Sequence, residues 1–351
     1  MSKFHTLKIK EIKQETEKAV SIAFTVPTDL ASTFSFIPGQ YITLKTEIKG
    51  EEVRRAYSIC SSSSSTELRV AVKAVEKGLF SNHAVSILKE GDSLDVAPPE
   101  GKFVLETNAA NTKNYIAFAA GSGITPIMSM IKSVLTQEMS SKFVLVYGNK
   151  SEEDAIFKAE LDALVATYPK QLEIQYVFSK KLHDGALFGR IDKSVTNLLV
   201  KNKHKNISFD GYFLCGPEAM INTVTETLKE NNVEAGKIHF ELFSVAEATG
   251  SDATKNLDGN SLVTVVLDDE ETTIEVSKKE ILLNAMLDKD LDAPYSCQGG
   301  ICSSCIGKVT EGKAVMDNNA ILTDSEIADG YILTCQAHAT TDKLKIDFDD
   351  V

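Results

Sequence analysis

Six cysteines lie in this 351-residue chain, and four of them have a spacing that suits an iron–sulfur cluster. Cys297, Cys302 and Cys305 lie in one short loop as C-x4-C-x2-C, and Cys335 follows in the sequence LTCQAH. Plant-type 2Fe-2S clusters use this arrangement, in which one loop wraps the cluster and a distant cysteine completes the ligand set. Two consecutive glycines give the loop the backbone freedom that tight wrapping requires. The spacing therefore predicts that these four thiolates bind a 2Fe-2S cluster.

Other uses of the cysteines stay open at this point. A structural zinc site also binds four thiolates, but it usually takes them as two C-x2-C pairs or with histidines, and only Cys302 and Cys305 have that spacing. A Rieske centre needs two histidine ligands, and the histidine nearest to a thiol, His338, is expected at the surface. Disulfides form in oxidising compartments, and the sequence MSKFHTLKIK lacks the features of a secretory signal. We therefore expect reduced cysteines in a cytoplasmic protein.

The composition indicates a globular protein with an excess of negative charge. Hydrophobic residues make up 43% of the chain and charged residues 25%, as in ordinary soluble proteins. The length of the chain predicts about two or three domains. The formal net charge of −13 argues against a nucleic-acid partner, and residues 260–351 hold 7 lysines against 18 aspartates and glutamates. No apolar run is long enough to cross a bilayer, so we expect no membrane partner.

Hydrophobic periodicity divides the chain into three domains and a linker. Residues 1–108 alternate apolar and polar side chains in segments such as AVSIAFTV and LRVAVKAV, which predicts an antiparallel β-barrel. Residues 109–245 alternate buried strands with helices, including a helix expected over SEEDAIFKAELDALVATY, which predicts an α/β domain with a parallel sheet. Residues 246–260 are small and polar, as in a linker. Residues 261–351 form the third domain, of mixed α+β type, around the cysteine loop.

Two segments of the predicted barrel suit a flavin. Arg55, Tyr57 and Ser58 follow a strand, and they provide a cation for a phosphate, an aromatic face for stacking and a donor for the reactive ring. Gly78 and Ser81 lie at a turn that opens a short helix, where backbone N–H groups and a hydroxyl could hold a pyrophosphate. Such a pyrophosphate site favours FAD over FMN. Taken singly, Arg and Tyr in a strand more often have surface and packing roles.

The α/β domain has two glycine-containing strand ends. AAGSGITP places Gly121 and Gly123 between a buried strand and a helix, where backbone can approach a coenzyme pyrophosphate. This is not the full G-x-G-x-x-G fingerprint, and alone it would more often be a simple loop. FLCGPEAM places Cys215 at the same carboxyl edge of the sheet, where open α/β sheets bind ligands. Cys215 is either a small buried residue or part of the nicotinamide pocket.

In this order the motifs resemble the ferredoxin-NADP reductase superfamily with a plant-type ferredoxin fused behind it. The resemblance rests on RAYS, GLFS, AAGSGITP, CGPEAM and the C-terminal cysteines, and it covers essentially the whole chain. It implies an FAD-binding β-barrel at 1–108, an NAD(P)-binding α/β domain at 109–245 and a β-grasp-like 2Fe-2S ferredoxin domain at 261–351. VYGN, FELF and GYILTCQAH further resemble the reductase subunits of phenylacetyl-CoA epoxidase and related oxygenases.

The resemblance also implies roles for individual residues. Arg55, Tyr57 and Ser58 would bind the flavin and its phosphate, and Cys215 would lie beside the nicotinamide. The FAD pyrophosphate would contact Gly78, Phe80 and Ser81. The pyridine nucleotide would contact Gly121, Gly123 and Thr125. The flavin ring would lie near Glu241 and Phe243. Ser58, Cys215 and Glu241 are the expected catalytic residues.

Together the three sites predict a path for electrons from NADPH or NADH to an external partner. A nicotinamide gives up two electrons as a hydride, whereas a 2Fe-2S cluster accepts one at a time, so a flavin between them is required. We therefore expect an NAD(P)H-dependent oxidoreductase that reduces the oxygenase or epoxidase component of a multicomponent system. A reductase for another monooxygenase or dioxygenase is the alternative. A redox sensor would not need a complete nucleotide-binding sheet.

Two finer expectations concern the coenzyme and the partner. Ser179, Lys180 and Lys181 follow a predicted strand where a 2′-phosphate could bind, which favours NADPH over NADH, although a solvated charge cluster explains them nearly as well. The acidic C-terminal domain is expected to dock on a basic patch of the oxygenase, because opposite charges speed encounter without tight binding.

Overall fold

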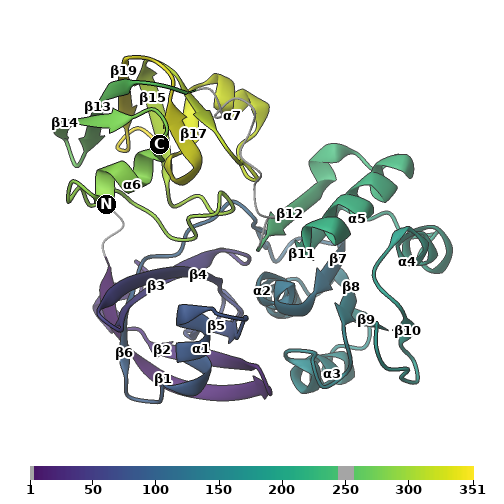
Figure 1. The fold of residues 1–351 in the computed structure, drawn as a ribbon. Coiled ribbons are helices and arrows are strands. Elements are labelled where there is room, and N and C mark those ends of the chain that lie inside the picture. Colours follow the sequence, from purple (N-terminus) through teal and green to yellow (C-terminus); the bar gives the residue numbers. More distant parts are fainter. Residues whose placement is uncertain (1–3, 244–256) are drawn as a thin grey trace. The chain divides into compact units, whose positions relative to one another are not determined.

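The computed structural model describes residues 4–243 and 257–351. It divides into two compact units. Residues 4–53 and 57–243 form the first, which contains the barrel and the parallel sheet, and residues 257–351 form most of the second, to which the short stretch 54–56 is also assigned. Figure 1 shows the elements of each unit. No helix in the described residues is both long and apolar enough to cross a membrane.

The first sheet is antiparallel and six-stranded, with the order β4-β3-β6-β1-β2-β5. A β-bridge between Ile59, which follows β4, and Val70 within β5 joins the two edges of the sheet, so that it closes into the expected barrel. Its interior holds alternate residues of the strands, such as Ile22, Ile42 and Leu44, which are fully buried. The elements are β1 (His5–Thr16), β2 (Ala19–Thr25), β3 (Tyr41–Ile48), β4 (Glu51–Ser58), β5 (Leu68–Lys73), α1 (Leu79–Ser86) and β6 (Ser93–Val96).

The second sheet is fully parallel, with the order β10-β9-β8-β7-β11-β12. Successive residues of β7 face opposite sides: Ala117 packs towards α2 and α3, and Phe118 packs towards α5. The chain reverses its direction of travel across the sheet between β7 and β11, and this is the place where open α/β sheets bind ligands. The elements are β7 (Asn114–Ala120), α2 (Ile124–Gln137), β8 (Lys142–Asn149), α3 (Lys158–Thr167), β9 (Leu172–Phe178), β10 (Leu187–Phe188), α4 (Lys193–Asn197), β11 (Gly211–Gly216), α5 (Glu218–Glu230) and β12 (Ile238–Leu242).

Helix α3 is shorter than the sequence predicts. The expected helix covers residues 151–168, but α3 begins at Lys158. Phe157 precedes it in the left-handed backbone conformation, with φ of 63°, and its side chain is buried against the sheet. Burial of this ring therefore decides the backbone conformation, in place of the helical pattern of the sequence around it.

The second unit is of α+β type, as predicted. A five-stranded sheet has the order β14-β13-β19-β15-β17, and β16 pairs with β18 in a small second sheet. Helix α6 buries Leu282, Leu283 and Met286 against the larger sheet, which gives this unit its own hydrophobic core. The elements are β13 (Asn260–Leu267), β14 (Glu270–Ser277), α6 (Leu282–Leu287), β15 (Ile306–Glu311), β16 (Ala314–Met316), α7 (Asp324–Ala328), β17 (Tyr331–Leu333), β18 (Ala337–Ala339) and β19 (Lys343–Asp347).

One buried carboxylate ties the end of helix α2 to the segment that leads from the barrel into the parallel sheet. Glu138 is fully buried, and its side chain accepts hydrogen bonds from Asn108 N at 3.0 Å, Asn111 Nδ2 at 2.7 Å and the Tyr115 hydroxyl at 3.2 Å. The last of these partners lies in β7. A buried charge is tolerated only when such donors surround it, so Glu138 fixes the entry of the chain into the sheet.

We expect Glu138→Ala to lower the free energy of unfolding by about 3 kcal/mol, because it leaves several buried donors without an acceptor. Glu138→Gln keeps one acceptor oxygen and should lose less. Urea denaturation of the three proteins, followed by circular dichroism, measures the difference. Equal stability of Glu138→Ala and the wild type would contradict this role.

Candidate functional site

The carboxyl end of strand β4 presents the three residues predicted to bind a flavin. Arg55 is partly buried, and its Nη1 donates to the Arg54 carbonyl at 2.6 Å. The Tyr57 ring packs against Phe80 with a centroid distance of 5.4 Å. Ser58 is buried, and its hydroxyl donates to Glu241 Oε2 at 3.4 Å. A cation, an aromatic face and a hydroxyl therefore lie along a single strand.

The turn before α1 brings Gly78 close to neighbouring side chains. Gly78 is the N-cap residue of α1, and a Cβ atom added there would lie 2.3 Å from Ser81 Oγ and 2.6 Å from a Val75 methyl carbon. Asn82 Nδ2 holds the turn by donating to the carbonyls of Val75 and Gly78. The Phe80 side chain is only 1% exposed, so a contact from Phe80 to a pyrophosphate would use its backbone N–H. The N–H groups of a helix's first turn have no partner within the helix and suit an anion.

The glycine loop after β7 packs directly against the end of β11. Gly121 has a φ of +57°, which favours glycine. At Gly123 an added Cβ would lie 2.1 Å from the Cys215 carbonyl oxygen, so only glycine allows α2 to begin this close to β11. The Thr125 hydroxyl donates to the Ser122 carbonyl at 3.0 Å and thus shapes the loop from within. The two predicted coenzyme segments therefore meet at the switch point of the sheet.

The predicted catalytic residues come together at this edge. Cys215 and Glu241 are paired neighbours on the parallel strands β11 and β12, and Glu241 also receives the Ser58 hydrogen bond. Burial and the Glu241 charge raise the pKa of Cys215 well above its ordinary value, so the thiol stays protonated. Burial raises the pKa of Glu241 to about 8, against the opposing effect of the Ser58 hydroxyl. Phe243 follows β12 and packs on the core under the sheet. At neutral pH the side chains of Cys215 and Glu241 are therefore uncharged, and each can donate a hydrogen bond.

The sequence patterns missed Lys73. This residue ends strand β5, is partly buried, and carries its Nζ atom 3.8 Å from the position of a Cβ added at Gly121. Burial lowers its pKa, since the ammonium is held away from water. A cation beside the glycine loop suits a coenzyme phosphate. No motif surrounds it in the sequence, so the only available signal was its place at the end of the strand before the Gly78 turn.

Some of the residues expected to select NADPH already have partners within the protein. Lys181 forms an ion pair of 2.7 Å with Glu153, and both side chains are exposed. The backbone N–H of Ser179 donates to the Asn149 carbonyl, and that of Lys180 donates to the Lys150 carbonyl. This leaves the Lys180 side chain as the better candidate for a 2′-phosphate at the carboxyl end of β9.

The four predicted cluster ligands lie together in the second unit. The Cys297 thiol is within hydrogen-bonding reach of Cys302 and Cys335, and the Cys335 thiol is also within reach of Cys305. These contacts lower the pKa of Cys297 and raise the pKa of Cys335. Across residues 4–243 and 257–351, no three His, Cys, Asp or Glu side chains are arranged to hold a single metal ion. A 2Fe-2S cluster instead shares four thiolates between two irons.

Hydrogen-bond donors around the cysteines fit such a cluster. The Gly299 N–H donates to Cys297 Sγ at 3.3 Å. Gln336 Nε2 donates to the Gln298 carbonyl at 3.0 Å and lies 3.9 Å from Cys335 Sγ, so it links the loop to the fourth ligand. The Ser296 hydroxyl is buried beside Cys297 and has no hydrogen-bond partner among the described residues, as expected of a donor that awaits a sulfur acceptor.

His338 is not a surface residue, contrary to the expectation from the sequence. It is 5% exposed, because it lies in β18 opposite Val315 of β16. Its Nε2 contacts Asp317 Oδ2 at 3.0 Å. The histidine therefore has a local carboxylate partner.

Three known domain families match the chain. The oxidoreductase FAD-binding domain matches residues 6–105, the oxidoreductase NAD-binding domain residues 118–226 and the 2Fe-2S iron-sulfur cluster binding domain residues 265–340. With the geometry above, these matches define the chain as a reductase of the iron–sulfur flavoprotein class. The predicted fold class and cofactors are confirmed.

Relatives match over the full length. One subunit of the 1,2-phenylacetyl-CoA epoxidase of Escherichia coli (strain K12) is 37% identical over 351 residues, which is 99% of both chains. The 3-ketosteroid-9-alpha-monooxygenase, ferredoxin reductase component, of Rhodococcus rhodochrous is 34% identical over 355 residues, 97% of this chain and 96% of that protein. Among solved structures, phthalate dioxygenase reductase matches 98% of both chains at 25% identity with a TM-score of 0.61. The chain belongs to this family of reductase components of multicomponent oxygenases.

Each single Cys→Ser substitution at Cys297, Cys302, Cys305 or Cys335 should remove the cluster and leave the flavin and its reduction by coenzyme intact. Cys60→Ser is the matched control, because Cys60 is a buried thiol in the other unit that donates to the Arg69 carbonyl, as a serine also can. Iron analysis and visible absorption of the purified proteins measure the outcome. A Cys335→Ser protein with a normal cluster would contradict the ligand assignment.

The raised pKa of Glu241 predicts a pH dependence of stability. The pKa of Glu241 is 4.5 in the unfolded chain and about 8 in the folded protein, so between these pH values the folded state binds a proton that the unfolded state has lost. The stabilising effect of this proton is fully present below pH 4.5 and is lost as pH rises through 8. Glu241→Gln stays neutral and should lose less stability over that range. Melting temperatures of both proteins from pH 5 to 9 measure this difference, and parallel curves would show that the carboxylate does not titrate as expected.

Proposed function

We propose that this protein is the reductase of a phenylacetyl-CoA epoxidase system and passes electrons from NADPH to the oxygenase component. The observation that carries the proposal is the full-length similarity to one component of that epoxidase, 37% identity over 99% of both chains. A reductase for another monooxygenase is the second candidate, since the 3-ketosteroid-9-alpha-monooxygenase component is nearly as similar, at 34% identity. Free thiols and a 2Fe-2S cluster suit a reducing compartment, so we place the protein in the cytoplasm.

The barrel residues bind and orient the flavin in this proposal. Tyr57 offers its ring for stacking, Arg55 neutralises phosphate charge, and the α1 N-terminus at Gly78 and Ser81 holds the pyrophosphate that distinguishes FAD from FMN. When bound, the flavin accepts an electron pair from the nicotinamide and releases the electrons singly. Ser58 supplies a hydroxyl at the end of the same strand, and its bond to Glu241 sets the direction of that hydroxyl.

The edge of the parallel sheet binds the coenzyme. Gly121 and Gly123 let its pyrophosphate approach the N-terminus of α2, and Lys73 adds a positive charge beside the same loop. Cys215, as a neutral thiol, lines the place where the nicotinamide meets the flavin, and Glu241 closes it from the neighbouring strand. These groups orient the two rings and exclude water. None of them is required to transfer a proton for hydride transfer itself.

The acidic second unit docks on the oxygenase. Several of its lysines are already paired with carboxylates, as in Lys278–Asp342, Lys308–Asp350 and Lys345–Glu271. The exposed Asp288 and Asp290 lie in the stretch that leads to Cys297. Lys289 lies exposed between these two aspartates, so the stretch keeps a small net negative charge, which favours a basic partner and fast, weak encounter.

The test combines the purified protein with the oxygenase component of phenylacetyl-CoA epoxidase. We expect NADPH oxidation coupled to epoxide formation, with a higher kcat/KM for NADPH than for NADH. Raising the ionic strength from low to high salt should slow the coupled reaction about tenfold or more, because steering between opposite charges is screened.

Reduction of an artificial dye acceptor is the control, and it should change little with salt. Coupled turnover with a steroid monooxygenase but not with the epoxidase would contradict the proposed partner. A partner reaction as insensitive to salt as the dye reaction would contradict docking through the acidic surface.

A further inference from the structure

The serine-rich loop that follows β4 is joined to helix α2 by hydroxyl groups. Ser129 Oγ donates to the Ser61 carbonyl at 2.7 Å. The Ser63 N–H donates to Ser133 Oγ at 3.0 Å, and Ser62 Oγ lies 3.4 Å from the same atom. We call these five residues, Ser61, Ser62, Ser63, Ser129 and Ser133, the serine seam. It joins the barrel to the parallel sheet within one compact unit.

Four of the five seam residues are buried and Ser63 is partly exposed, so water has little access to most of these hydrogen bonds. Ser129 and Ser133 are 0% exposed, and Ser61 is 2% exposed. Burial of hydroxyl groups is unfavourable unless each finds a partner, whereas replacing both partners by apolar groups of the same shape can be nearly neutral. Hydroxyls differ from apolar groups in that their contacts have a fixed direction and length. Their use here specifies one placement of α2 against the loop.

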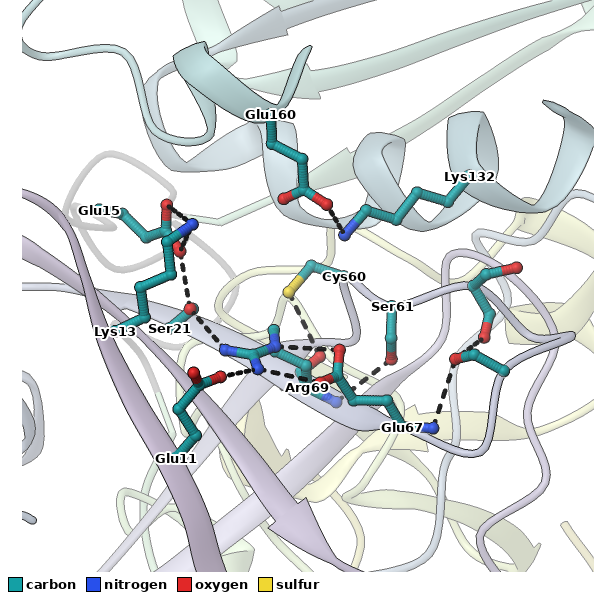
Figure 2. A network of polar contacts seen from close by, with 12 residues as sticks. Glu11, Lys13, Glu15, Ser21, Cys60, Ser61, Glu67, Arg69, Lys132 and Glu160 are labelled. Carbon is teal, nitrogen blue, oxygen red and sulfur yellow. Dashed lines mark hydrogen bonds and ion pairs between the residues drawn. The ribbon is translucent and has the colours of Figure 1, made fainter. Parts of the chain in front are cut away.

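The barrel holds the other side of the same loop. Figure 2 shows Arg69 of β5 between its acidic partners Glu11 and Glu67, with Cys60 and Ser61 next to its backbone. The Arg69 N–H donates to Ser61 Oγ at 3.2 Å, and the Cys60 N–H donates to the Arg69 carbonyl at 2.8 Å. The loop cannot move far from the barrel, so the bonds of Ser129 and Ser133 transmit the barrel's position to α2.

Both ends of the seam lead directly to the candidate site. Ser61 lies three residues after Ser58, which ends the flavin strand. Ser129 lies four residues after Thr125, about one helical turn from the glycine loop at the start of α2. A shift of α2 along its axis would therefore move the coenzyme loop relative to Ser58 by a similar distance.

We propose that Ser129 and Ser133 are positioning residues for hydride transfer, which hold the coenzyme loop at the correct distance from the flavin strand. The inference rests on the proposed function, since it concerns the same hydride step from NADPH or NADH. Hydride transfer depends steeply on the separation and alignment of the donor and acceptor, and a displacement of about 1 Å can slow such a step about a hundredfold. Neither serine contacts the coenzyme in this proposal, so binding is unaffected.

Anaerobic stopped-flow reduction of the FAD-loaded, full-length protein tests the inference, with the variants Ser129→Ala and Ser133→Ala. We expect the limiting rate of flavin reduction per bound FAD to fall about tenfold or more in each, with an unchanged dissociation constant for NADPH. Ser133→Thr keeps the hydroxyl and should restore the rate. Thr223→Ala is the matched control, because among the residues that the structure describes the Thr223 hydroxyl bonds only to the Ala219 carbonyl of its own helix.

The outcomes distinguish a failure of the proposed function from a failure of the positioning role. If the wild-type flavin is not reduced by NADPH or NADH, the proposed function is wrong. If the wild type is reduced and both alanine variants match its limiting rate within twofold per bound FAD, the positioning role is wrong and the proposed function stands. A loss of FAD content without any change in that rate also overturns the inference, because it would show a purely structural role. If Ser129→Ala does not fold, Ser133→Ala decides alone.

Discussion

The contact between the end of strand β4 and the edge of the parallel sheet is the constraint on which the rest of the first unit depends. Ser58 reaches Glu241 at 3.4 Å, and Gly123 lies against the Cys215 carbonyl with no room for a side chain. In the proposed function, a flavin on one side and a nicotinamide on the other meet within this small region, and hydride transfer tolerates little displacement. One hydrophobic cluster also joins the two parts, because it contains Ala19, Cys60 and Ala71 of the barrel together with residues of the parallel sheet and α2.

Other polar groups fix how the barrel joins the parallel sheet and helix α2. Glu138 holds the chain where it enters the sheet, and the serine seam holds helix α2 against the loop after β4. Electron transfer to and from a cluster needs no such bond-length alignment. In agreement with this difference, the predicted cluster ligands lie in a separate unit with its own core, where Gln336 and the backbone of Gly299 provide hydrogen-bond donors near the thiols.

Much of this organisation could be predicted from the sequence, because cysteine spacing, glycine positions and periodicity are local signals. The fold class and the 2Fe-2S domain were predictable on those grounds, and the sheet topology and the matching domain families confirm them. The features that were missed depend on tertiary contacts. His338 is buried because β18 pairs with β16, and α3 begins late because Phe157 turns into the core. Lys73 has no motif, and a run of serines indicates a turn without indicating that α2 lies across it.

A crystal structure of the protein with bound FAD and an oxidised coenzyme would test the central claim most directly. The account predicts that the nicotinamide stacks on the flavin ring between Ser58 and Cys215, with Glu241 beside both and the coenzyme pyrophosphate on the Gly121–Gly123 loop. A flavin bound away from Tyr57 and Ser58, or a nicotinamide distant from Cys215, would contradict it.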